Sequence, residues 1–367
     1  HYAGSDNKKL LMITEQQTEG ARPLATLEAA VTWLRTRTRV TLPSVAWWEL
    51  VGYGLLVAIA IVMRLWDLGA RAMHHDESLH ALYSWNLVSG LGYQHNPMMH
   101  GPLQFEANAV LFMVFGDSDF SARLLYAMFG TALVVMPFLF RNRLGTRGAL
   151  FAAVLITVSP SMLYFSRFAR NDILMAVWAF GLVISMWRFM DEGRTRYLYI
   201  SAALLALAFG TKETAYLLTV TLGLFLGLMT GVPGLARILR PVQIVGVSPP
   251  VAAGRLVRAL INAYTQGFEI SKLSRHGSYL LLLITLTLPQ WSALVSLFQD
   301  TSLLSWTNLV LAAPEGSQSI GVPLGGGQAI AFLIVVTLLG VSAVIGYRWN
   351  WGVWWRAAVV FYSIWLL

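Results

Sequence analysis

Apolar runs recur along the chain from residue 45 onward, and short polar links separate them. Each run holds roughly twenty apolar residues, which is the length of helix that crosses the hydrocarbon core of a bilayer. A chain inside the bilayer must satisfy its own backbone hydrogen bonds, so we expect an all-α polytopic membrane protein built as a helical bundle. The pattern predicts about nine spans, at 45–63, 121–140, 148–165, 172–190, 197–210, 215–229, 277–298, 328–347 and from 357 onward.

One apolar segment does not fit this pattern. Residues 103–115 are shorter than a span and include Glu106 and Asn108. A run of this length more often lies in the membrane interface than crosses the bilayer. If it does not cross, most of the 26 Lys and Arg residues fall on the cytoplasmic side; if it crosses, most fall outside. The positive-inside rule therefore favours a juxtamembrane helix on the outer face, with the N-terminus in the cytoplasm.

This topology divides the chain into four parts. Residues 1–44 carry apolar side chains at helical spacing, so we expect a cytoplasmic amphipathic segment there, with a plain solvated segment as the alternative. Residues 45–230 form the expected membrane core, whose first outer loop is 64–120. A cytoplasmic loop at 231–276 and further transmembrane helices at 277–367 follow.

Composition supports a membrane protein. The chain is 56% hydrophobic and 12% charged, which is too apolar for an average soluble domain. Its net charge of +8 is explained by basic residues collecting in cytoplasmic loops, so we expect no nucleic-acid partner. The absence of cysteine excludes disulfide and thiol chemistry. The sequence begins at His1 and stops within an apolar run at Leu367, so we expect the C-terminal portion to be incomplete.

The first outer loop gathers most of the chain's 7 histidines beside a pair of carboxylates, Asp76 and Glu77. Titratable groups beside a membrane are costly to keep and are usually functional. Asp76 is positioned to act as a general base, although acidic residues are also common at the start of a helix. The histidines of this stretch are His74, His75, His80, His95 and His100.

Metal binding is an open possibility in the same loop. Asp76 and His80 share a helix face, and His75 is adjacent. Imidazole and carboxylate groups suit zinc or manganese, and carboxylates also suit magnesium, so His75 and His80 are candidate metal ligands. The alternative is that these histidines hydrogen-bond the loop or a substrate. We expect no other cofactor.

Two later clusters complete the candidate site. Arg167 and Arg170 flank a very short outer turn, and the arginine fork suits a phosphate. Asp172 begins the next apolar run, where a carboxylate is also favoured simply by the helix start. Lys212 and Glu213 follow the span at 197–210, where a lysine can snorkel or hold a lipid phosphate. We add two residues of the first outer loop to these candidates for substrate binding, Tyr93 and the residue before a Gly-Pro corner, His100.

These motifs together resemble the GT-C superfamily of integral-membrane glycosyltransferases over residues 45–230. The branch that they are most similar to contains protein O-mannosyltransferases and aminoarabinose transferases, and within it the family of flippase-activity-associated proteins. The motifs are HHDESLHA at 74–81, HGPL at 100–103, FGDSDFSARLL at 115–125, SPSMLYFSRFARND at 159–172 and GTKET at 210–214.

The resemblance implies a GT-C-like bundle that moves a hexosyl or pentosyl group from a polyprenyl-phosphate donor to a glycan, lipid or protein on the non-cytoplasmic face. It implies an inverting displacement in which Asp76, with Glu77 beside it, takes the acceptor proton. It also implies that Asp172 is the second acidic site, and that Arg170 and Lys212 hold the leaving phosphate. We therefore expect the separate clusters to meet in one cavity at the outer rim of the cell membrane.

Two other functions remain open from the sequence. The chain can be a non-catalytic subunit of a larger membrane complex, as the tryptophan-rich stretch at 349–355 would suit. It can also be an accessory to the flipping of lipid-linked sugars. Charges in the middle of several spans would favour flipping, whereas the candidate charges here lie at the ends of spans.

Overall fold

The computed structural model describes residues 45–93, 99–239, 251, 254–255, 273–299, 301, 308–314 and 321–366. The chain divides into two compact units, His1–Val51 and Gly52–Leu367. The first unit is described only at residues 45–51, where helix α2 begins. The predicted amphipathic segment at 1–44 and most of the predicted loop at 231–276 lie outside the described residues.

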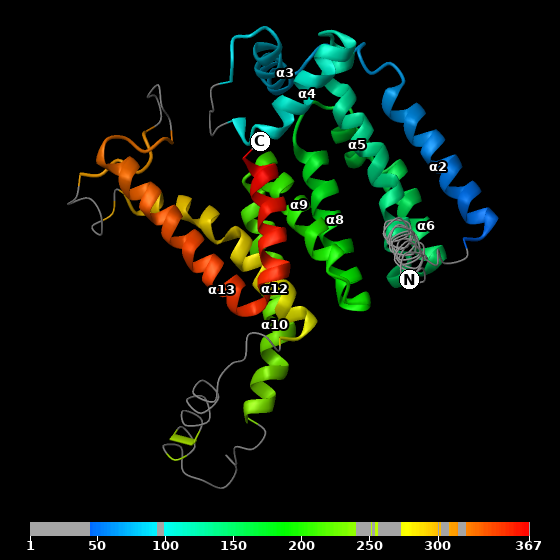
Figure 1. The fold of residues 1–367 in the computed structure, drawn as a ribbon. Helices are drawn as coiled ribbons and strands as arrows, with labels where there is room; N and C mark the ends of the chain where they lie inside the picture. Colours follow the sequence, from blue (N-terminus) through cyan, green and yellow to red (C-terminus); the bar gives the residue numbers. More distant parts are fainter. Residues whose placement is uncertain are drawn as a thin grey trace, which may run out of the picture. The chain divides into compact units, whose positions relative to one another are not determined.

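The described chain is helical, which confirms the predicted fold class (Figure 1). Its only bridge between extended segments joins Val310 to Leu324 within the described ranges. The elements are α2 (Trp47–Leu65), α3 (His75–Val88), α4 (Leu103–Phe115), α5 (Asp119–Leu139), α6 (Arg141–Val158), α7 (Pro160–Ser166), α8 (Asp172–Glu192), α9 (Arg196–Thr211), α10 (Thr214–Leu239), α12 (Arg275–Thr287), the 3₁₀ helix η3 (Leu288–Phe298) and α13 (Gly326–Trp365).

Six described helical segments are long and apolar enough to cross a membrane, and a seventh is added if α6 and α7, which meet at 61°, form one broken span. The prediction of nine spans is therefore not confirmed. Helix α9 has 16 residues and falls short of a full span. The last two predicted spans belong to the single element α13, which breaks at Asn350, and Figure 1 shows the chain reversing direction there. Helix α4, at 13 residues, is too short to cross, as expected.

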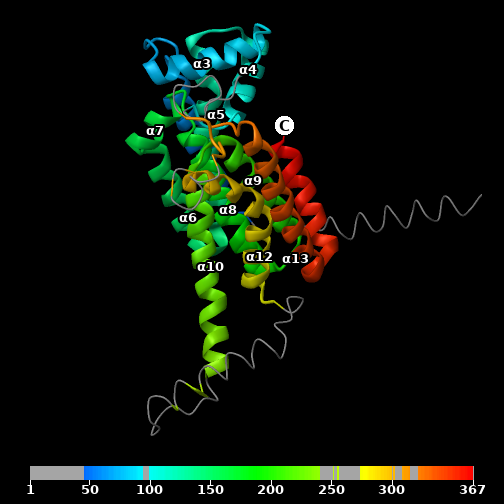
Figure 2. The same ribbon diagram turned by 90° about the vertical axis from the view of Figure 1, so that its left-hand side faces the viewer.

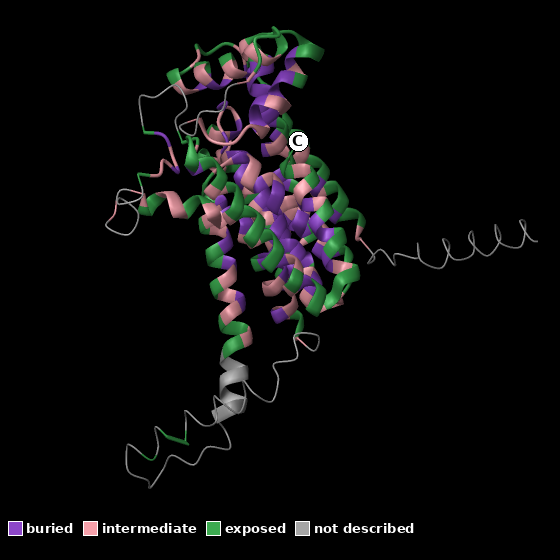
Figure 3. Ribbon diagram, turned by 60° about the vertical axis from the view of Figure 1, so that its left-hand side comes forward, coloured by how far each residue is buried: buried purple, intermediate pink, exposed green. Residues whose placement is uncertain are grey.

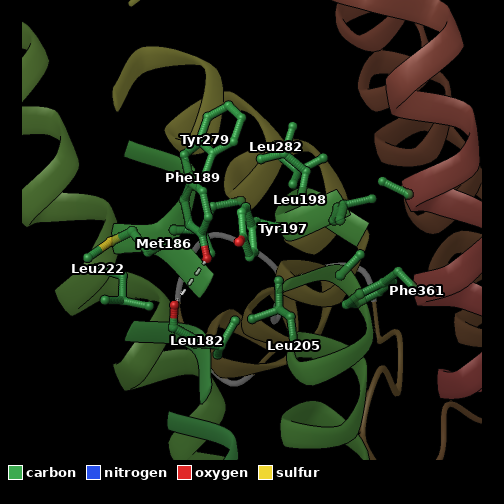
Figure 4. Close-up of a cluster of buried hydrophobic side chains, with 14 of the residues drawn as sticks. Leu182, Met186, Phe189, Tyr197, Leu198, Leu205, Leu222, Tyr279, Leu282 and Phe361 are labelled. Atoms are coloured by element: carbon green, nitrogen blue, oxygen red, sulfur yellow. Dashed lines mark hydrogen bonds between the residues drawn. The ribbon is translucent and has the colours of Figure 1, made fainter. Parts of the chain in front are cut away.

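Buried side chains lie along the middle of the bundle, and many apolar side chains on its outer faces are exposed (Figure 3). Exposed apolar surface on a spanning helix is the surface that lipid covers. The larger core joins α8, α9, α10, α12 and α13, and Figure 4 shows Leu182, Leu205 and Phe361 within it. Here the Tyr279 hydroxyl donates to Ser201 Oγ at 2.7 Å, so a buried polar group is satisfied between two helices.

A second core joins α5 to α8 and α9, through residues such as Tyr126, Ile173 and Trp178. Helices α3 and α4 lie beyond one end of α5 (Figure 2). The turn between α7 and α8 and the turn between α9 and α10 reach the same end, because hydrogen bonds join both of them to residues 76–101. This end of the bundle carries the candidate site.

Candidate active site

Four side chains of alternating charge join the separate sequence clusters, and we call them the charged chain: Asp76, Arg170, Asp172 and Lys212. Arg170 Nη1 lies 3.2 Å from Asp76 Oδ2, and Arg170 Nε lies 3.6 Å from Asp172 Oδ2. Lys212 Nζ lies 2.8 Å from Asp172 Oδ1. The side chains of Asp76 and Arg170 are each 37% exposed, so both are accessible to a substrate. The structure therefore brings together the first outer loop, the α7–α8 turn and the α9–α10 turn, as the sequence motifs predict.

The start of α3 positions Asp76 through a capping box. The His74 ring nitrogen Nδ1 accepts a hydrogen bond from the Asp76 backbone amide at 3.3 Å. The Glu77 carboxylate accepts one from the His74 amide at 3.0 Å. This reciprocal pair satisfies amides that have no partner inside the helix. The local sequence HHDE therefore sets the first turn of α3, and Asp76 projects from it.

Glu77 is buried, and its carboxylate accepts hydrogen bonds from helix α5, from the segment that precedes α3 and from the α7–α8 turn. Arg123 of α5 donates at 2.8 and 3.0 Å, and Arg71 donates at 2.8 Å. The backbone amides of Ala169 and His74 each donate at 3.0 Å. Burial by itself raises the pKa of Glu77, but the hydrogen bonds from Arg123, His74 and Ala169 outweigh it and leave the pKa lowered. Glu77 is thus an ionised anchor that ties α3 to α5 and to the α7–α8 turn.

The Gly-Pro corner is pressed against the end of α9. His100 has a φ of 69°, and the Gly101 amide donates to the Thr211 carbonyl at 3.2 Å. A Cβ atom on Gly101 would lie 2.1 Å from the Gly210 carbonyl oxygen, so only glycine fits. Asn171 Nδ2 donates to the same Thr211 carbonyl at 2.9 Å. This one carbonyl therefore joins the corner, the start of α8 and the α9–α10 turn.

A pocket of about 280 Å³ opens beside the charged chain. Its polar end carries His100, Lys212 and Glu213, and His100 Nδ1 lies 2.7 Å from Glu213 Oε2. Burial tends to raise the pKa of Glu213, but the hydrogen bond with His100 leaves it lowered, so the carboxylate is ionised. The rest of the lining is largely apolar or aromatic, and consists of Gly101, Pro102, Phe209, Gly210, Tyr216, Gln290 and Trp365.

His80 occupies a buried network whose proton positions follow from its partners. The Tyr126 hydroxyl donates to Gln104 Oε1 at 3.2 Å, so the other end of that amide, Nε2, faces His80 Nδ1 at 2.6 Å. An amide nitrogen donates, so Nδ1 accepts and the proton of the neutral ring lies on Nε2. Burial, followed by the nearby charge of His100, lowers the pKa of His80 to about 4. The ring is therefore neutral at physiological pH.

Two other predicted residues, Arg167 and Tyr93, contact different partners. Arg167 Nη1 donates to the carbonyls of Met63 at 2.9 Å and Trp66 at 2.7 Å, and so closes the end of α2. Tyr93 packs its ring 5.5 Å from that of Phe105, and burial raises the pKa of Tyr93 to about 12.

The predicted metal ligands do not converge. His75 is exposed at the first turn of α3, while His80 is buried against Gln104. In the part of the chain that the structure describes, no group of three His, Asp or Glu side chains could hold an ion. The described residues do not fit a metal site, and we derive no step through a metal. His95 lies outside the described residues.

Arg123, Gln104 and Tyr126 belong to this site but were not predicted from the sequence. Arg123 had a signal, because it is an arginine inside an apolar run, and such residues mark a buried partner. Gln104 and Tyr126 had no such signal, because the sequence of an apolar helix does not show which partner a single polar side chain contacts.

Comparisons with known proteins agree with the motifs. The family of dolichyl-phosphate-mannose-protein mannosyltransferases matches residues 99–241. No curated protein matches the sequence. Among solved structures, the chain is similar to the archaeal oligosaccharyltransferase AglB from Archaeoglobus fulgidus, in complex with an inhibitory peptide and a dolichol-phosphate. That likeness has 16% identity and a TM-score of 0.45 over 87% of this chain, and the chain spans about half the length of AglB, 50% of it.

The family match covers α4 to α10, and with them Arg170, Asp172, Lys212 and Glu213. The HGPL, SPSMLYFSRFARND and GTKET motifs also lie within the matched residues. The predicted resemblance to the GT-C superfamily is thereby confirmed, through its protein mannosyltransferase family.

Proposed function

We propose that this chain transfers a sugar from a polyprenyl-phosphate donor to a hydroxyl group of an acceptor on the non-cytoplasmic face of the membrane. The observation that carries the proposal is the charged chain from Asp76 through Arg170 and Asp172 to Lys212. It holds a solvent-accessible carboxylate beside two cations, which are the groups that proton removal and phosphate departure require. The dolichol-phosphate bound to AglB is consistent with a lipid-linked donor.

In the proposed reaction Asp76 acts as the base. Its carboxylate removes the proton of the acceptor hydroxyl as that oxygen attacks the anomeric carbon. The bond from the anomeric carbon to the phosphate oxygen breaks, and polyprenyl phosphate leaves with the electron pair. A single displacement of this kind inverts the anomeric configuration. General-base assistance contributes about 10²- to 10⁴-fold in rate.

Arg170 and Lys212 stabilise the negative charge that grows on the leaving phosphate. Before a donor binds, Asp172 accepts from Lys212 at 2.8 Å and lies 3.6 Å from Arg170, which keeps both cations in place. Charged donors fixed in advance stabilise a developing charge without reorganising. Glu77 does not react in this scheme. Its hydrogen bonds position Asp76, so it is a positioning residue.

The pocket beside Lys212 suits the donor. Its polar end faces a phosphate and sugar, and its aromatic side, with Phe209, Tyr216 and Trp365, suits an isoprenoid chain. Because Lys212 lines this pocket and also pairs with Asp172, a phosphate held there lies next to the charged chain.

Asp76→Asn tests the proposal. The purified variants are reconstituted in lipid vesicles with radiolabelled polyprenyl-phosphate mannose and a membrane extract as the source of acceptors. We expect Asp76→Asn to lower the rate of transfer by about 10²- to 10⁴-fold. Asp117→Asn is the matched control, because Asp117 is exposed in the same outer region and lies outside the charged chain. Transfer by Asp76→Asn at the rate of the control would remove Asp76 from the mechanism.

A further inference from the structure

A second pocket, of about 350 Å³, contains three arginine side chains. We call it the arginine pocket; it is lined by Leu68, Arg71, Arg123, Pro160, Leu163, Tyr164 and Arg167. None of these residues lines the pocket beside Lys212, so the two pockets are separate. The start of α3 connects them. Glu77 bonds to Arg71 and Arg123 of the arginine pocket. Its neighbour Asp76 bonds to Arg170, which reaches Lys212 of the other pocket through Asp172.

The positive charge of the arginine pocket is only partly neutralised. Glu77 is the carboxylate that pairs with Arg71 and Arg123, so one negative charge serves two positive ones. Arg167 bonds to backbone carbonyls, which carry no net charge. Cations in a partly desolvated pocket attract an anion strongly, and the guanidinium fork matches a phosphate.

A fourth arginine adds to this field. Arg64 is fully buried in the last turn of α2, where it bonds to Ser166 Oγ and to the Ile156 carbonyl. Its Nη1 atom is buried without a hydrogen-bond partner. Arg167, at the end of α7, donates a hydrogen bond to the backbone carbonyl of Arg64. Both arginines therefore lie at the junction of α2 and α7. Uncompensated buried charge is costly, and a nearby anion would offset that cost.

The remaining walls of the pocket are apolar. Leu68, Pro160, Leu163 and Tyr164 surround the arginines, and Tyr164 is 48% exposed. Pro160, Leu163 and Tyr164 belong to α7, the short helix bent by 61° from α6. A ligand that fits this lining has a phosphate at one end and a hydrocarbon chain at the other.

We propose that the arginine pocket binds the phosphate headgroup of a second lipid, separate from the donor. Arg71 supplies the accessible guanidinium, because its side chain is 51% exposed and its bond to Glu77 uses one nitrogen. The hydrocarbon chain lies along α7. The inference rests on the charges and walls of this pocket and does not depend on the sugar-transfer proposal.

Photo-crosslinking locates such a lipid. The full chain is purified in a zwitterionic detergent and irradiated with a phosphatidylglycerol analogue that carries a diazirine next to the headgroup. Labelled peptides are then mapped by mass spectrometry. We expect labelling of residues 160–167, and we expect unlabelled phosphatidylglycerol to compete whereas phosphatidylcholine and inorganic phosphate do not.

Two variants and one control test the pocket itself. Arg71→Gln removes a charge and should weaken labelling of 160–167 by about tenfold or more, which is the loss expected for one charge-assisted hydrogen bond. Leu163→Trp fills the pocket without changing its charge and should also weaken labelling. Arg194→Gln is the matched control, because Arg194 is 58% exposed and pairs with one glutamate, Glu192.

Thermal unfolding of each variant checks whether the fold is retained. The inference is overturned if Arg71→Gln and Leu163→Trp both label as the wild type does. It is also overturned if inorganic phosphate competes as well as phosphatidylglycerol, because the pocket would then bind a free anion. Neither result would bear on sugar transfer, which Asp76→Asn tests in a separate assay.

Discussion

Asp76 and Glu77 are neighbours in the chain, but their side chains have opposite surroundings. Asp76 is 37% exposed and bonds to one arginine, whereas Glu77 is fully buried and accepts from two arginines and two backbone amides. A carboxylate whose lone pairs are all occupied cannot take a proton from a substrate without breaking those bonds. The difference assigns reaction to Asp76 and positioning to Glu77 in our proposal.

Lys212→Gln is expected to lower the rate of sugar transfer by about 10²-fold or more, because it removes a positive charge that stabilises the leaving phosphate. Donor binding should weaken as well, and both effects are measured by varying the concentration of polyprenyl-phosphate mannose. Arg194→Gln serves as the control, since it removes an exposed charge next to Glu192. Equal rates for the two variants would exclude Lys212 from the donor site.

The lowered pKa of His80 predicts that the free energy of unfolding decreases in mild acid. Burial and the charge of His100 lower its pKa from 6.5 to about 4, so the folded protein keeps the ring neutral while the unfolded chain protonates it. Its contribution is therefore complete above pH 6.5 and is lost as the pH falls towards 4. The gap between 6.5 and about 4 corresponds to a loss on the order of 3 kcal/mol.

The measurement is thermal unfolding of the detergent-solubilised protein between pH 7.5 and pH 4. Acidic residues also titrate in this range, so the informative quantity is the difference between the wild type and His80→Gln. That difference should shrink as the pH falls. A difference that stays constant with pH would show that His80 is not held neutral.

Among the structural elements, the short turns at one end of the bundle make the contacts that bring the candidate site residues together. The Thr211 carbonyl accepts from Gly101 and Asn171, and so couples the Gly-Pro corner to α8 and α9. The motifs HGPL and GTKET were each recognisable in the sequence, and the resemblance implied that they share a cavity, but the hydrogen bond that joins them through the Thr211 carbonyl was not predicted. Their contact depends on the directions in which α4, α8 and α9 leave their turns, which no local pattern specifies.

Gly101→Ala should disrupt this junction. The new Cβ atom would meet the Gly210 carbonyl oxygen at 2.1 Å, and backbone cannot rotate out of the way as a side chain can. We expect a destabilisation of about 1–3 kcal/mol, as for other overpacked sites, together with reduced transfer. Gly227→Ala is the control, because a Cβ atom there meets nothing within 4 Å. If the two variants unfold at the same midpoint, the close approach of Gly101 to the Gly210 carbonyl is contradicted.

Across the full chain, charge and hydropathy predict which end of the bundle faces out. The charged chain and the arginine pocket both lie at the start of α3. At the C-terminal end of α8, Arg143 pairs with Asp191 and Arg194 pairs with Glu192. We expect the first end to be extracytoplasmic and the second to be cytoplasmic, in line with the positive-inside rule.

The absence of cysteine makes this topology directly testable. Asp117→Cys and Arg194→Cys each introduce one thiol at an exposed position. A membrane-impermeant maleimide applied to intact cells should label Asp117→Cys, and it should label Arg194→Cys only after the membrane is permeabilised. The reverse pattern would place the candidate site in the cytoplasm and contradict the proposed acceptor side.

The apolar runs alone predicted the helical membrane fold and, with the charge count, the short non-spanning helix at 103–115. This was possible because a helix in lipid satisfies its hydrogen bonds within its own segment, so local sequence decides where it forms. The number of spans was not confirmed, since helix length and the reversal at Asn350 depend on neighbouring helices. The contact of Arg170 with both Asp76 and Asp172, the burial of Glu77 and the arginine pocket came only from the folded chain. Each arises from groups far apart in sequence, and their positions follow from how the helix ends pack together.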